Sequence, residues 1–586
     1  MIVFLHIAGL ALVSANQEAI FPWHKKPAKT PPFDPKEFEA KVDRTVGKLL
    51  FENKLADHTL YSGVAGGNQF ATIWVRDFCH ATGGLLLKPS WRIGSKDVPS
   101  KQIVLSTLKE ILSLIHDGQD DSKIKIPRAL DSLGAHEDLL TFKVLKGGAD
   151  LKKKVVWPFG EKDPGVGMQK FPHGKMYGYF KGEAGASETC DAGYLLILAF
   201  TRVAPLLNDT ELTDFLQSSK DKLKKAIDFY SSAHRWETRN DKWYFNQTAW
   251  SEWKDSVKQE GISSYSNLQL VEALTKLIKL MKNDNRVAGA LAEAKLFGPR
   301  FGSTGPQKLG DGSNGQYDAL LGHLHDWTMD VYDYFHDNST GLLRELDSHK
   351  DKELLKISHI DANLQWLETN EHSQEAQKLI SLSKISEAFV QRNHGGGLRT
   401  LHGINTLGWP QKEVSPGKSV IGLYQYHGTF AWSWWTCWFA EIAAKESNTE
   451  LAQELLQFIW RTQYDSALGD QKFSNYISEV YSNTHIVHTI GYVSETPFLW
   501  GSSYCVRAIE ALKQTQAATT ATPAALEEEG QLKHEVNQVN NTALFENAEA
   551  ESEPKQRLSR RFSLRSNAKL EATLQGSDEA MFLQEL

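Results

Sequence analysis

The sequence predicts an all-α fold, namely an (α/α)6 toroid of six helical hairpins with long loops around a central pocket. Helical periodicity dominates between about residues 36 and 513, and strand-like alternation is rare there. Apolar helices are repeatedly followed by amphipathic ones, and about a dozen helical segments of ordinary length fit the span. A helix that is apolar all round must be buried, while an amphipathic helix covers it from the solvent side.

Three helix pairs show this alternation most clearly. They are 192–207 with 212–233, 265–280 with 286–296, and 428–444 with 450–462. We expect the first member of each pair in an inner layer and the second in an outer layer. An open helical solenoid would also stack hairpins, but it would show a repeating sequence period, and none is visible. The pattern therefore favours a closed ring.

Composition excludes several classes of protein. The chain has 586 residues, of which 41% are hydrophobic, so a large core can form and a mainly disordered chain is excluded. There are 65 Lys and Arg against 72 Asp and Glu, a formal charge of −7. This balance argues against a nucleic-acid partner, which requires a basic face. The 17 Trp can serve core packing or stacking on sugar rings.

The chain ends differ in character from the helical region. Met1–Val13 is an apolar run of signal-peptide length, followed by small residues and a plausible cleavage point after Ala15. This run is too short to span a bilayer, so we expect secretion or residence in the secretory-pathway lumen, with no integral membrane span. We divide the chain into a signal peptide at 1–15, a Pro-rich lead-in at 16–39, a helical domain at 40–513, and a disordered low-complexity tail at 514–586.

Sequons and cysteines are compatible with that compartment. Glycosylation sequons occur at Asn208, Asn246, Asn338 and Asn540, and they permit a glycoprotein. The cysteines are Cys79, Cys190, Cys437 and Cys505. They are far apart and lack zinc spacing, so buried thiols are expected, with one or two disulfides as the alternative.

The first candidate motif is an Arg-Asp pair at the start of an apolar helix. Trp74, Arg76 and Asp77 lie there. A buried charged pair is costly unless its members are paired or bound to a ligand. The rigid donor fork of Arg76 beside an acceptor suits the neighbouring hydroxyls of a sugar, and a structural ion pair is the alternative.

The second motif carries acidic residues ahead of another inner-type helix. Trp253 and Asp255 precede Gly261 and an apolar helix. An Asp beside a Trp can have a raised pKa through desolvation, as a general acid needs. A surface helix cap is the alternative for Asp255. Glu252 and Glu260 lie close enough in sequence to take the acid role instead.

Further acidic residues precede the remaining apolar helices. Asp191 stands at the start of the most apolar helix, where it can cap that helix or line a pocket. Glu479 and Glu495 precede an aromatic helix start at Trp500, and either can be a base. The aromatic run 424–438 has the pattern of a buried helix, so most of its rings are expected in the core.

The joint order of these motifs resembles the six-hairpin (α/α)6 glycosidases. The resemblance covers roughly residues 40–512 and is to the amylo-α-1,6-glucosidase domains of glycogen debranching enzymes, the alkaline/neutral invertases, and the trehalase and processing α-glucosidase relatives. Trp74-Val75-Arg76-Asp77-Phe78 is similar to the motif that binds sugar in the −1 subsite. Trp253-Lys254-Asp255 followed by Gly261 resembles the general-acid motif, and Asp361 lies in a segment that resembles a shared inner-helix start.

The resemblance implies an exo-acting, inverting, glucosidase-like hydrolase of an oligo- or polysaccharide. Asp255 would be the general acid and Glu479 the general base, with Glu495 as the alternative base. No metal and no cofactor is implied. The substrate-binding residues would be Trp74, Arg76, Asp77, Asp191, Trp253 and Trp500.

Three other functions remain open from the sequence. A sugar isomerase or epimerase on the same toroid would use two facing histidines as acid and base. The available histidines are His80, His173, His427, His485 and His488. A phosphorylase would need an anion site, and a non-catalytic carbohydrate-binding relative would place no carboxylate at the scissile bond.

Overall fold

The computed structural model describes most of the helical region. The described residues are 31–54, 58–66, 72–115, 124, 126–127, 129–131, 166–170, 176–180, 190–248, 251–254, 259–310, 314–347, 357–371, 373–391, 397–399, 401–402, 427, 430–465, 475–481, 486, 488–489 and 492–520. The chain divides into one compact unit, Met1–Thr519, and a second unit, Thr520–Leu586. The expected signal peptide and nearly all of the expected tail lie outside the described residues.

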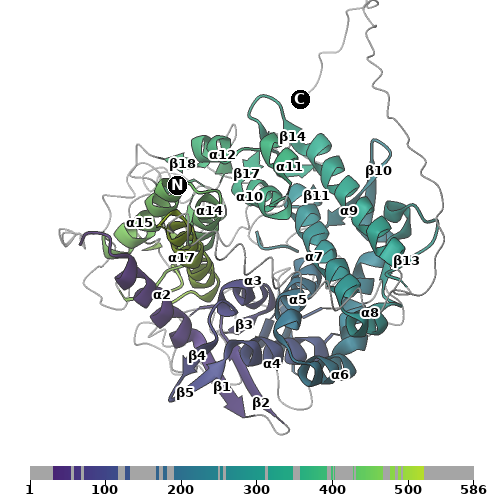
Figure 1. The fold of residues 1–586 in the computed structure, drawn as a ribbon, viewed down its shortest axis with the longest axis horizontal. Coiled ribbons are helices and arrows are strands. Elements are labelled where there is room, and N and C mark those ends of the chain that lie inside the picture. The colour runs from purple at the N-terminus through teal and green to yellow at the C-terminus, as the bar shows by residue number, and fades with distance from the viewer. Residues whose placement is uncertain are drawn as a thin grey trace, which may run out of the picture. The chain divides into compact units, whose positions relative to one another are not determined.

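Six buried helices form a closed series of contacts. They are α3 (Val75–Leu85), α5 (Cys190–Val203), α7 (Ser264–Asn283), α10 (Ile360–Thr369), α14 (Ser433–Lys445) and α17 (Leu499–Thr520). Helices α3 to α14 contact one another in chain order. Helix α17 is joined to α14 by the disulfide Cys437–Cys505, and it returns to α3 where Ser503 Oγ accepts a hydrogen bond from Gly84 N at 3.1 Å. Figure 1 shows these helices nearest the middle of the unit.

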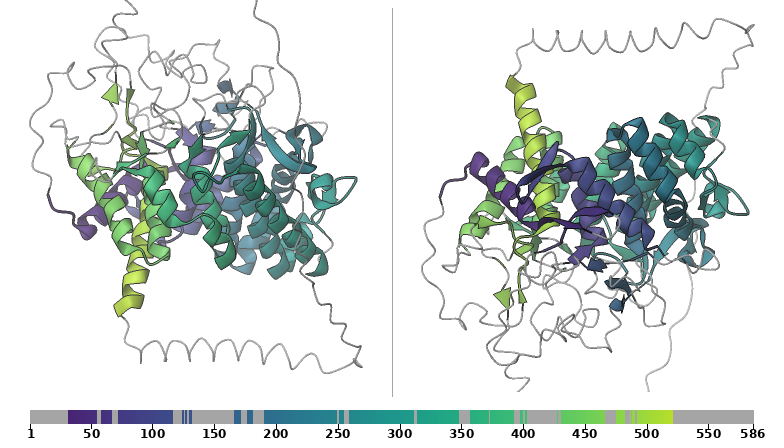
Figure 2. Two further views of the ribbon diagram at one scale, coloured as in Figure 1. Left: turned by 90° about the horizontal axis from the view of Figure 1, so that it is seen from above. Right: turned by 90° about the horizontal axis from the view of Figure 1, so that it is seen from below.

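A second set of helices covers the buried ones from outside. They are α2 (Pro35–Leu49), α4 (Ser100–Ser113), α6 (Asp209–Asp228), α9 (Asn314–Phe335), α12 (Leu382–Phe389) and α15 (Thr449–Asp465). Helix α6 buries Leu212, Phe215 and Leu223 and exposes Asp214, Lys220 and Asp221. Figure 1 shows these helices at the periphery of the unit. Figure 2 shows that the buried and covering helices lie side by side in a single layer.

The predicted helix pairs are confirmed at two of the three places. Helices α5 and α6 match the first pair, and α14 and α15 match the third, although α14 begins only at Ser433 because residues 431–432 form a strand. The second pair is corrected. Helix α7 forms as expected, but its follower α8 (Asn285–Leu291) is short, because the chain turns into strand β12 (Lys295–Leu296) and then reaches Gly298-Pro299. The long helix α9 covers α7 instead.

The domain bounds expected from sequence differ from the helix ends at both sides. Helix α2 starts at Pro35, within the expected lead-in, because Asp34 caps it and Pro suits the first turn. Helix α17 continues to Thr520, beyond the expected end at 513. Its last turns contain Gln and Ala, which have high helix propensity, and Thr515 Oγ1 donates a hydrogen bond to Ala444 O of α14 at 2.8 Å.

Short antiparallel strands are more common than the sequence indicates. One sheet joins β3 (Thr72–Trp74), β6 (Ala129–Asp131), β8 (Met176–Phe180) and β7 (Val166–Lys170). Another joins β16 (Leu346–Asp347), β11 (Gly261–Ser263), β10 (Lys242–Gln247) and β9 (Trp236–Arg239). The two-stranded pairs include β1 (Leu50–Lys54) with β2 (Thr59–Gly63), β4 (Ser90–Ile93) with β5 (Lys96–Pro99), β14 (His336–Asp337) with β15 (Leu342–Leu343), β17 (Ser358–His359) with β20 (Leu401–His402), and β21 (Ala431–Trp432) with β22 (Val480–Tyr481).

These strands matter because they fix where the buried helices begin. Strands β3, β11, β17 and β21 run directly into α3, α7, α10 and α14. Pairing of each strand with a neighbour sets the height and direction of the helix that follows. Among the residues that the structure describes, no helix is long and apolar enough to cross a membrane. Cys79 and Cys190 are free buried thiols.

Candidate active site

The starts of the buried helices meet at one end of the unit. Each covering helix carries the chain back, so successive buried helices begin at the same end. Arg76 in the first turn of α3 contacts Asp191 in the first turn of α5. Trp253, which precedes α7, donates a hydrogen bond to Asp361 in the first turn of α10 at 2.9 Å. Helix N-termini favour negative charge, which is consistent with the carboxylates gathered here.

Arg76, Asp77 and Asp191 form the first group, which we call the rim set. Arg76 Nη1 donates to Asp191 Oδ2 at 3.1 Å, and Arg76 Nε lies 3.8 Å from Asp77 Oδ2. Arg76 and Asp77 are each 8% exposed and Asp191 is 4% exposed, so a small part of the set reaches solvent. Trp74 immediately precedes α3 and is 6% exposed. The rim set thus combines a donor fork with carboxylate acceptors at a position that is nearly closed to solvent.

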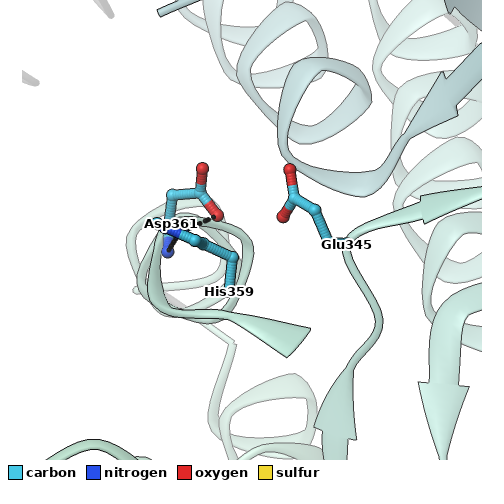
Figure 3. Close-up of side chains that lie close together, drawn as sticks. All are labelled: Glu345, His359 and Asp361. Atoms are coloured by element: carbon cyan, nitrogen blue, oxygen red, sulfur yellow. Dashed lines mark hydrogen bonds and ion pairs between the residues drawn. The ribbon is translucent and has the colours of Figure 1, made fainter. Parts of the chain in front are cut away.

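Lys254 organises a second, deeper group. Its ammonium lies 2.5 Å from Asp361 Oδ2, 2.7 Å from Glu345 Oε1 and 3.2 Å from Glu252 Oε1. His359 Nδ1 lies 3.0 Å from Asp361 Oδ1. We call these five residues the lysine cluster, and each is at most 1% exposed. Figure 3 shows Glu345 and Asp361 with their carboxyl groups facing one another across a gap.

Local structure explains why these side chains converge. The Glu252 segment is held to the start of α5, because Cys190 N donates to Ser251 O at 3.0 Å. Glu345 is held by Ser264 at the start of α7, whose backbone N–H donates to Glu345 O at 3.0 Å. Asp361 follows β17 in the first turn of α10, where its own carboxylate accepts from Ala362 N at 2.7 Å. Three separate connections therefore deliver carboxylates to one ammonium.

Burial and charge shift the pKa values of the cluster in opposite directions. Burial raises the pKa of Glu252 to about 7, although Lys254 counteracts part of this shift. Burial also raises the pKa of Glu345 well above its usual value. For Asp361 burial alone would raise the pKa, but His359 and Lys254 lower it overall. Asp361 is therefore the ionised partner of Lys254, while Glu252 can carry a proton near neutral pH.

Glu345, His359 and Asp361 also have the donor types of a metal site. Their ligand atoms all lie within 4.8 Å of one another. However, the ammonium of Lys254 contacts both Glu345 and Asp361 and supplies positive charge where a cation would bind. A divalent ion there would be repelled by Lys254. We therefore interpret the group as an ion-paired cluster.

Aromatic rings form the layer next to these charges. Trp253 meets Trp435 edge-on, with ring centres 4.8 Å apart, and is 3% exposed. Trp500 stacks on His80 at 4.5 Å and is 2% exposed. Trp434 lies 3.9 Å from Trp500. The expected wall residues Trp253 and Trp500 are thus largely covered by other aromatic rings, and only small areas of them face outward.

The expected base residues lie at the same end of the helices. Glu479 precedes β22, and Ser433 N at the start of α14 donates to Glu479 O at 2.9 Å. Glu479 N in turn donates to Glu495 O at 2.8 Å, so the two glutamates are neighbours. They are 3% and 0% exposed. Asp255, the expected acid, lies outside the described residues and directly follows Lys254.

The histidines of the isomerase alternative are partly described. Of the histidines named from the sequence, His80 stacks on Trp500 with ring centres 4.5 Å apart, and His427 lies 4.9 Å from the ring of Trp253. His359, which was not predicted from the sequence, lies 5.4 Å from the same Trp253 ring. Burial lowers the pKa of His359, although Asp361 opposes that shift. His173 and His485 lie outside the described residues, as does the side chain of His488.

Sequence reasoning missed the core of the lysine cluster. It had named neither Lys254 as a centre of charge nor Glu345 and His359 as site residues. The available signal was the run Glu252-Trp253-Lys254-Asp255, where three charged residues surround a Trp just before an apolar helix. A buried Lys in such a run requires carboxylate partners, and these come from distant segments.

Comparisons with known proteins give structural similarity without sequence similarity. No protein-family model matches the chain, and no curated protein sequence matches it. A solved wild-type glycosidase is similar to this chain with a TM-score of 0.43 and 11% identity, over 82% of this chain and 98% of that one. A cellobiose 2-epimerase from Bacillus thermoamylovorans is similar with a TM-score of 0.42 and 11% identity, over 81% and 98%. A rhamnosidase from Klebsiella oxytoca with rhamnose bound has a TM-score of 0.44 and 8% identity, over 84% and 66%.

Proposed function

We propose that this protein is a glycoside hydrolase built on an (α/α)6 toroid, exo-acting and inverting, with an oligo- or polysaccharide as substrate. The closed series of six buried helices and their outer cover support the toroid. The observation that carries the activity is a buried carboxyl group with a pKa of about 7, Glu252, within the electrostatic influence of Asp191 of the rim set. A protonated carboxyl group there would supply a proton close to side chains that can hydrogen-bond sugar hydroxyls.

The acid step requires a carboxyl group that is protonated near neutral pH. Asp255 is the proposed general acid, and it follows Lys254 directly in the chain. Glu252 is the alternative, supported by its raised pKa. In either case the acid would protonate the leaving glycosidic oxygen as the bond to the anomeric carbon breaks.

The base step requires a second carboxylate on the opposite side of the sugar. Glu479 is the proposed base, and its neighbour Glu495 is the alternative. The base would remove a proton from a water molecule that attacks the anomeric carbon. An inverting reaction needs the acid and base carboxyl groups about 6.5–9.5 Å apart, so that this water fits between them.

The rim set and its neighbouring Trp residues are the proposed substrate-binding residues. Arg76, Asp77 and Asp191 would hydrogen-bond the sugar hydroxyls, and Trp74, Trp253 and Trp500 would shape an apolar wall. The reaction needs neither a metal nor an organic cofactor. An anionic co-substrate, as a phosphorylase would use, would face the carboxylates of the rim set and the lysine cluster, so hydrolysis is the better proposal.

A screen with matched variants tests this proposal. The protein is assayed on α- and β-linked disaccharides for release of reducing sugar. The variants are Asp255→Asn, Glu252→Gln, Glu260→Gln, Glu479→Gln and Glu495→Gln, with Glu293→Gln, a surface carboxylate that is 69% exposed, as the control. We expect one acid variant and one base variant to lose about a thousandfold or more in kcat, and the control to retain activity. Absence of hydrolysis across the panel, or full activity in all five of these carboxyl variants, would contradict the proposal.

A sugar epimerase or isomerase is the second candidate. The observation that favours it is that His359 and His427 both pack against Trp253, next to the lysine cluster. Two such histidines can exchange a proton with a carbon next to a carbonyl group. Incubation of reducing sugars in D₂O, with NMR detection of carbon-bound deuterium, would reveal this activity. A non-catalytic carbohydrate-binding role predicts neither hydrolysis nor exchange.

We further propose that the protein is secreted or resides in the secretory-pathway lumen. Met1–Val13 has the character of a signal peptide, with residues 1–15 removed on maturation. The disulfide Cys437–Cys505 supports an oxidising compartment. In such a compartment the sequon residue Asn338, exposed in the turn between β14 and β15, is a candidate for glycosylation.

A further inference from the structure

Buried polar atoms without a hydrogen-bond partner gather on the inner helices. Within the part of the chain that the structure describes, they include His80 Nε2, Tyr194 OH, Tyr265 OH, Trp434 Nε1 and Trp500 Nε1. These residues belong to α3, α5, α7, α14 and α17. His80 lies one turn after Arg76, and Tyr194 lies one turn after Asp191. His80 and Tyr194 therefore lie one helical turn below the rim set.

Such atoms need an explanation, because proteins rarely bury unpaired donors and acceptors. A buried polar atom that gains no partner lowers the stability of the fold. Most buried polar groups in proteins are accordingly hydrogen-bonded to protein or to ordered water. Unpaired groups on the inner helices, close to the rim set and the lysine cluster, indicate that something outside the chain supplies the missing partners.

Two neighbouring tyrosines show the contrast directly. Tyr230 OH donates to Cys190 O at 2.8 Å and accepts from Tyr194 N at 2.6 Å. The ring of Tyr194 lies 6.1 Å from that of Tyr230, yet its own hydroxyl has no partner. Both residues are fully buried. Tyr265, 1% exposed, also has an unpartnered hydroxyl, and the ammonium of Lys254 lies 5.3 Å from its ring centre.

The unpartnered hydroxyls of Tyr194 and Tyr265 lie near the charged groups of the lysine cluster. Burial raises the pKa of Tyr265 well above its usual value, and Tyr194, Asp361 and Glu252 raise it further. Burial likewise raises the pKa of Tyr194, with a smaller contribution from Glu252. Both hydroxyls are therefore neutral at physiological pH and within electrostatic range of Glu252.

We propose that Tyr194 and Tyr265 are ligand-binding residues whose hydroxyls hydrogen-bond the hydroxyls of one neutral sugar unit. This proposal rests on the proposed function, which supplies a carbohydrate ligand. An anionic ligand would be repelled by the ionised Asp361, and a cationic one would compete with Lys254. A neutral polyhydroxyl ring matches neutral donors that stand beside aromatic rings.

The test compares three tyrosine-to-phenylalanine variants of the full-length protein. Tyr194→Phe and Tyr265→Phe each remove an unpartnered hydroxyl, while Tyr230→Phe removes a hydroxyl that is satisfied within the chain. The readouts are the Kd for glucose, mannose and galactose by calorimetry, and the urea midpoint of unfolding without sugar. Neither readout requires turnover.

We expect Tyr194→Phe and Tyr265→Phe to weaken hexose binding about fivefold each, which is the usual effect of one lost neutral hydrogen bond. Their urea midpoints without sugar should stay unchanged or rise. Tyr230→Phe should keep the wild-type Kd and show a lower urea midpoint.

Unchanged affinity in Tyr194→Phe and Tyr265→Phe would overturn the proposal. A fall of their urea midpoints equal to that of Tyr230→Phe would also overturn it, since the hydroxyls would then be satisfied inside the fold, for example by structural water. A wild-type protein that hydrolyses glycosides but binds none of the hexoses overturns this inference and leaves the hydrolase standing. A protein that binds hexoses through both tyrosines but hydrolyses nothing supports the inference and contradicts the hydrolase.

Discussion

Replacement of Lys254 by Met tests whether the lysine cluster is an ion-paired unit. Lys254→Met retains a long side chain but removes the ammonium that lies 2.5, 2.7 and 3.2 Å from Asp361, Glu345 and Glu252. These carboxyl groups would then face one another in a site that is at most 1% exposed. The variant should still fold, but with buried carboxylates that lack a cation.

The Lys254 ammonium neutralises buried carboxylate charge, so its removal should lower the free energy of unfolding. Removal of one partner from a buried ion pair costs about 3–5 kcal/mol, because the remaining charge stays desolvated. We expect a loss in this range at pH 8. At pH 5 the loss should be smaller, because without Lys254 the carboxyl pKa values rise and protonation removes the unpaired charge.

Urea unfolding followed by Trp fluorescence at pH 5 and pH 8 measures both quantities. The matched control is Lys308→Met. Lys308 pairs with Glu293 on the surface, where the side chains are 56% and 69% exposed, and this change should cost less than about 1 kcal/mol at either pH. A loss below about 1 kcal/mol for Lys254→Met at pH 8, or an equal loss at both pH values, would refute the reasoning.

Three further predictions concern the proton on Glu252, the role of the rim set in substrate binding, and the secretory compartment. Because the pKa of Glu252 is raised to about 7 in the folded protein, the folded state binds this proton more tightly than the unfolded state. Stability should therefore fall by up to about 3 kcal/mol between pH 4.5 and pH 7, and Glu252→Gln should flatten this slope in urea titrations. Arg76→Lys keeps the charge but loses the guanidinium fork that binds Asp191, so KM should rise about tenfold while the melting temperature changes little. In a eukaryotic secretory host, Asn338→Gln should remove one glycan detected by mass spectrometry, whereas Asn246→Gln, in the half-buried strand β10, should not.

Each of these predictions has a contradicting outcome. An unchanged pH slope in Glu252→Gln would mean that another group holds the proton. A collapse in melting temperature with Arg76→Lys would show that the rim set is structural. A protein without glycan at Asn338 but with glycan at Asn246 would contradict the burial argument, and a protein retained in the cell would contradict secretion.

The sequence predicted the helices well where their burial pattern was strong. The apolar character of α5 and α14 placed them in the interior, and the charged faces of α6 and α15 placed those helices outside. It also marked the starts of the inner helices at Arg76, Asp191 and Trp253. These features are local, since each follows from residues within a few turns of one another.

The rest depended on contacts between distant segments. Lys254 and Asp361 are 107 residues apart in sequence, and no pattern in either segment identifies the other as its partner. The same holds for Cys437 and Cys505, which are 68 residues apart. Sequence periodicity also could not show which helix covers α7. The long α9 does so, and not the short α8, because the apolar surface that α7 leaves to bury determines which helix packs on it.

The stereochemistry of the product tests the central claim most directly. Wild-type protein is mixed with a disaccharide that it cleaves, and the first sugar released is observed by proton NMR before its anomers equilibrate. We expect the anomer opposite in configuration to the bond that was cleaved, with formation of this product abolished by Glu479→Gln or Glu495→Gln. Release of the anomer with the original configuration, or no release of sugar from any glycoside, would contradict a hydrolase in which a base activates water across the site from the acid.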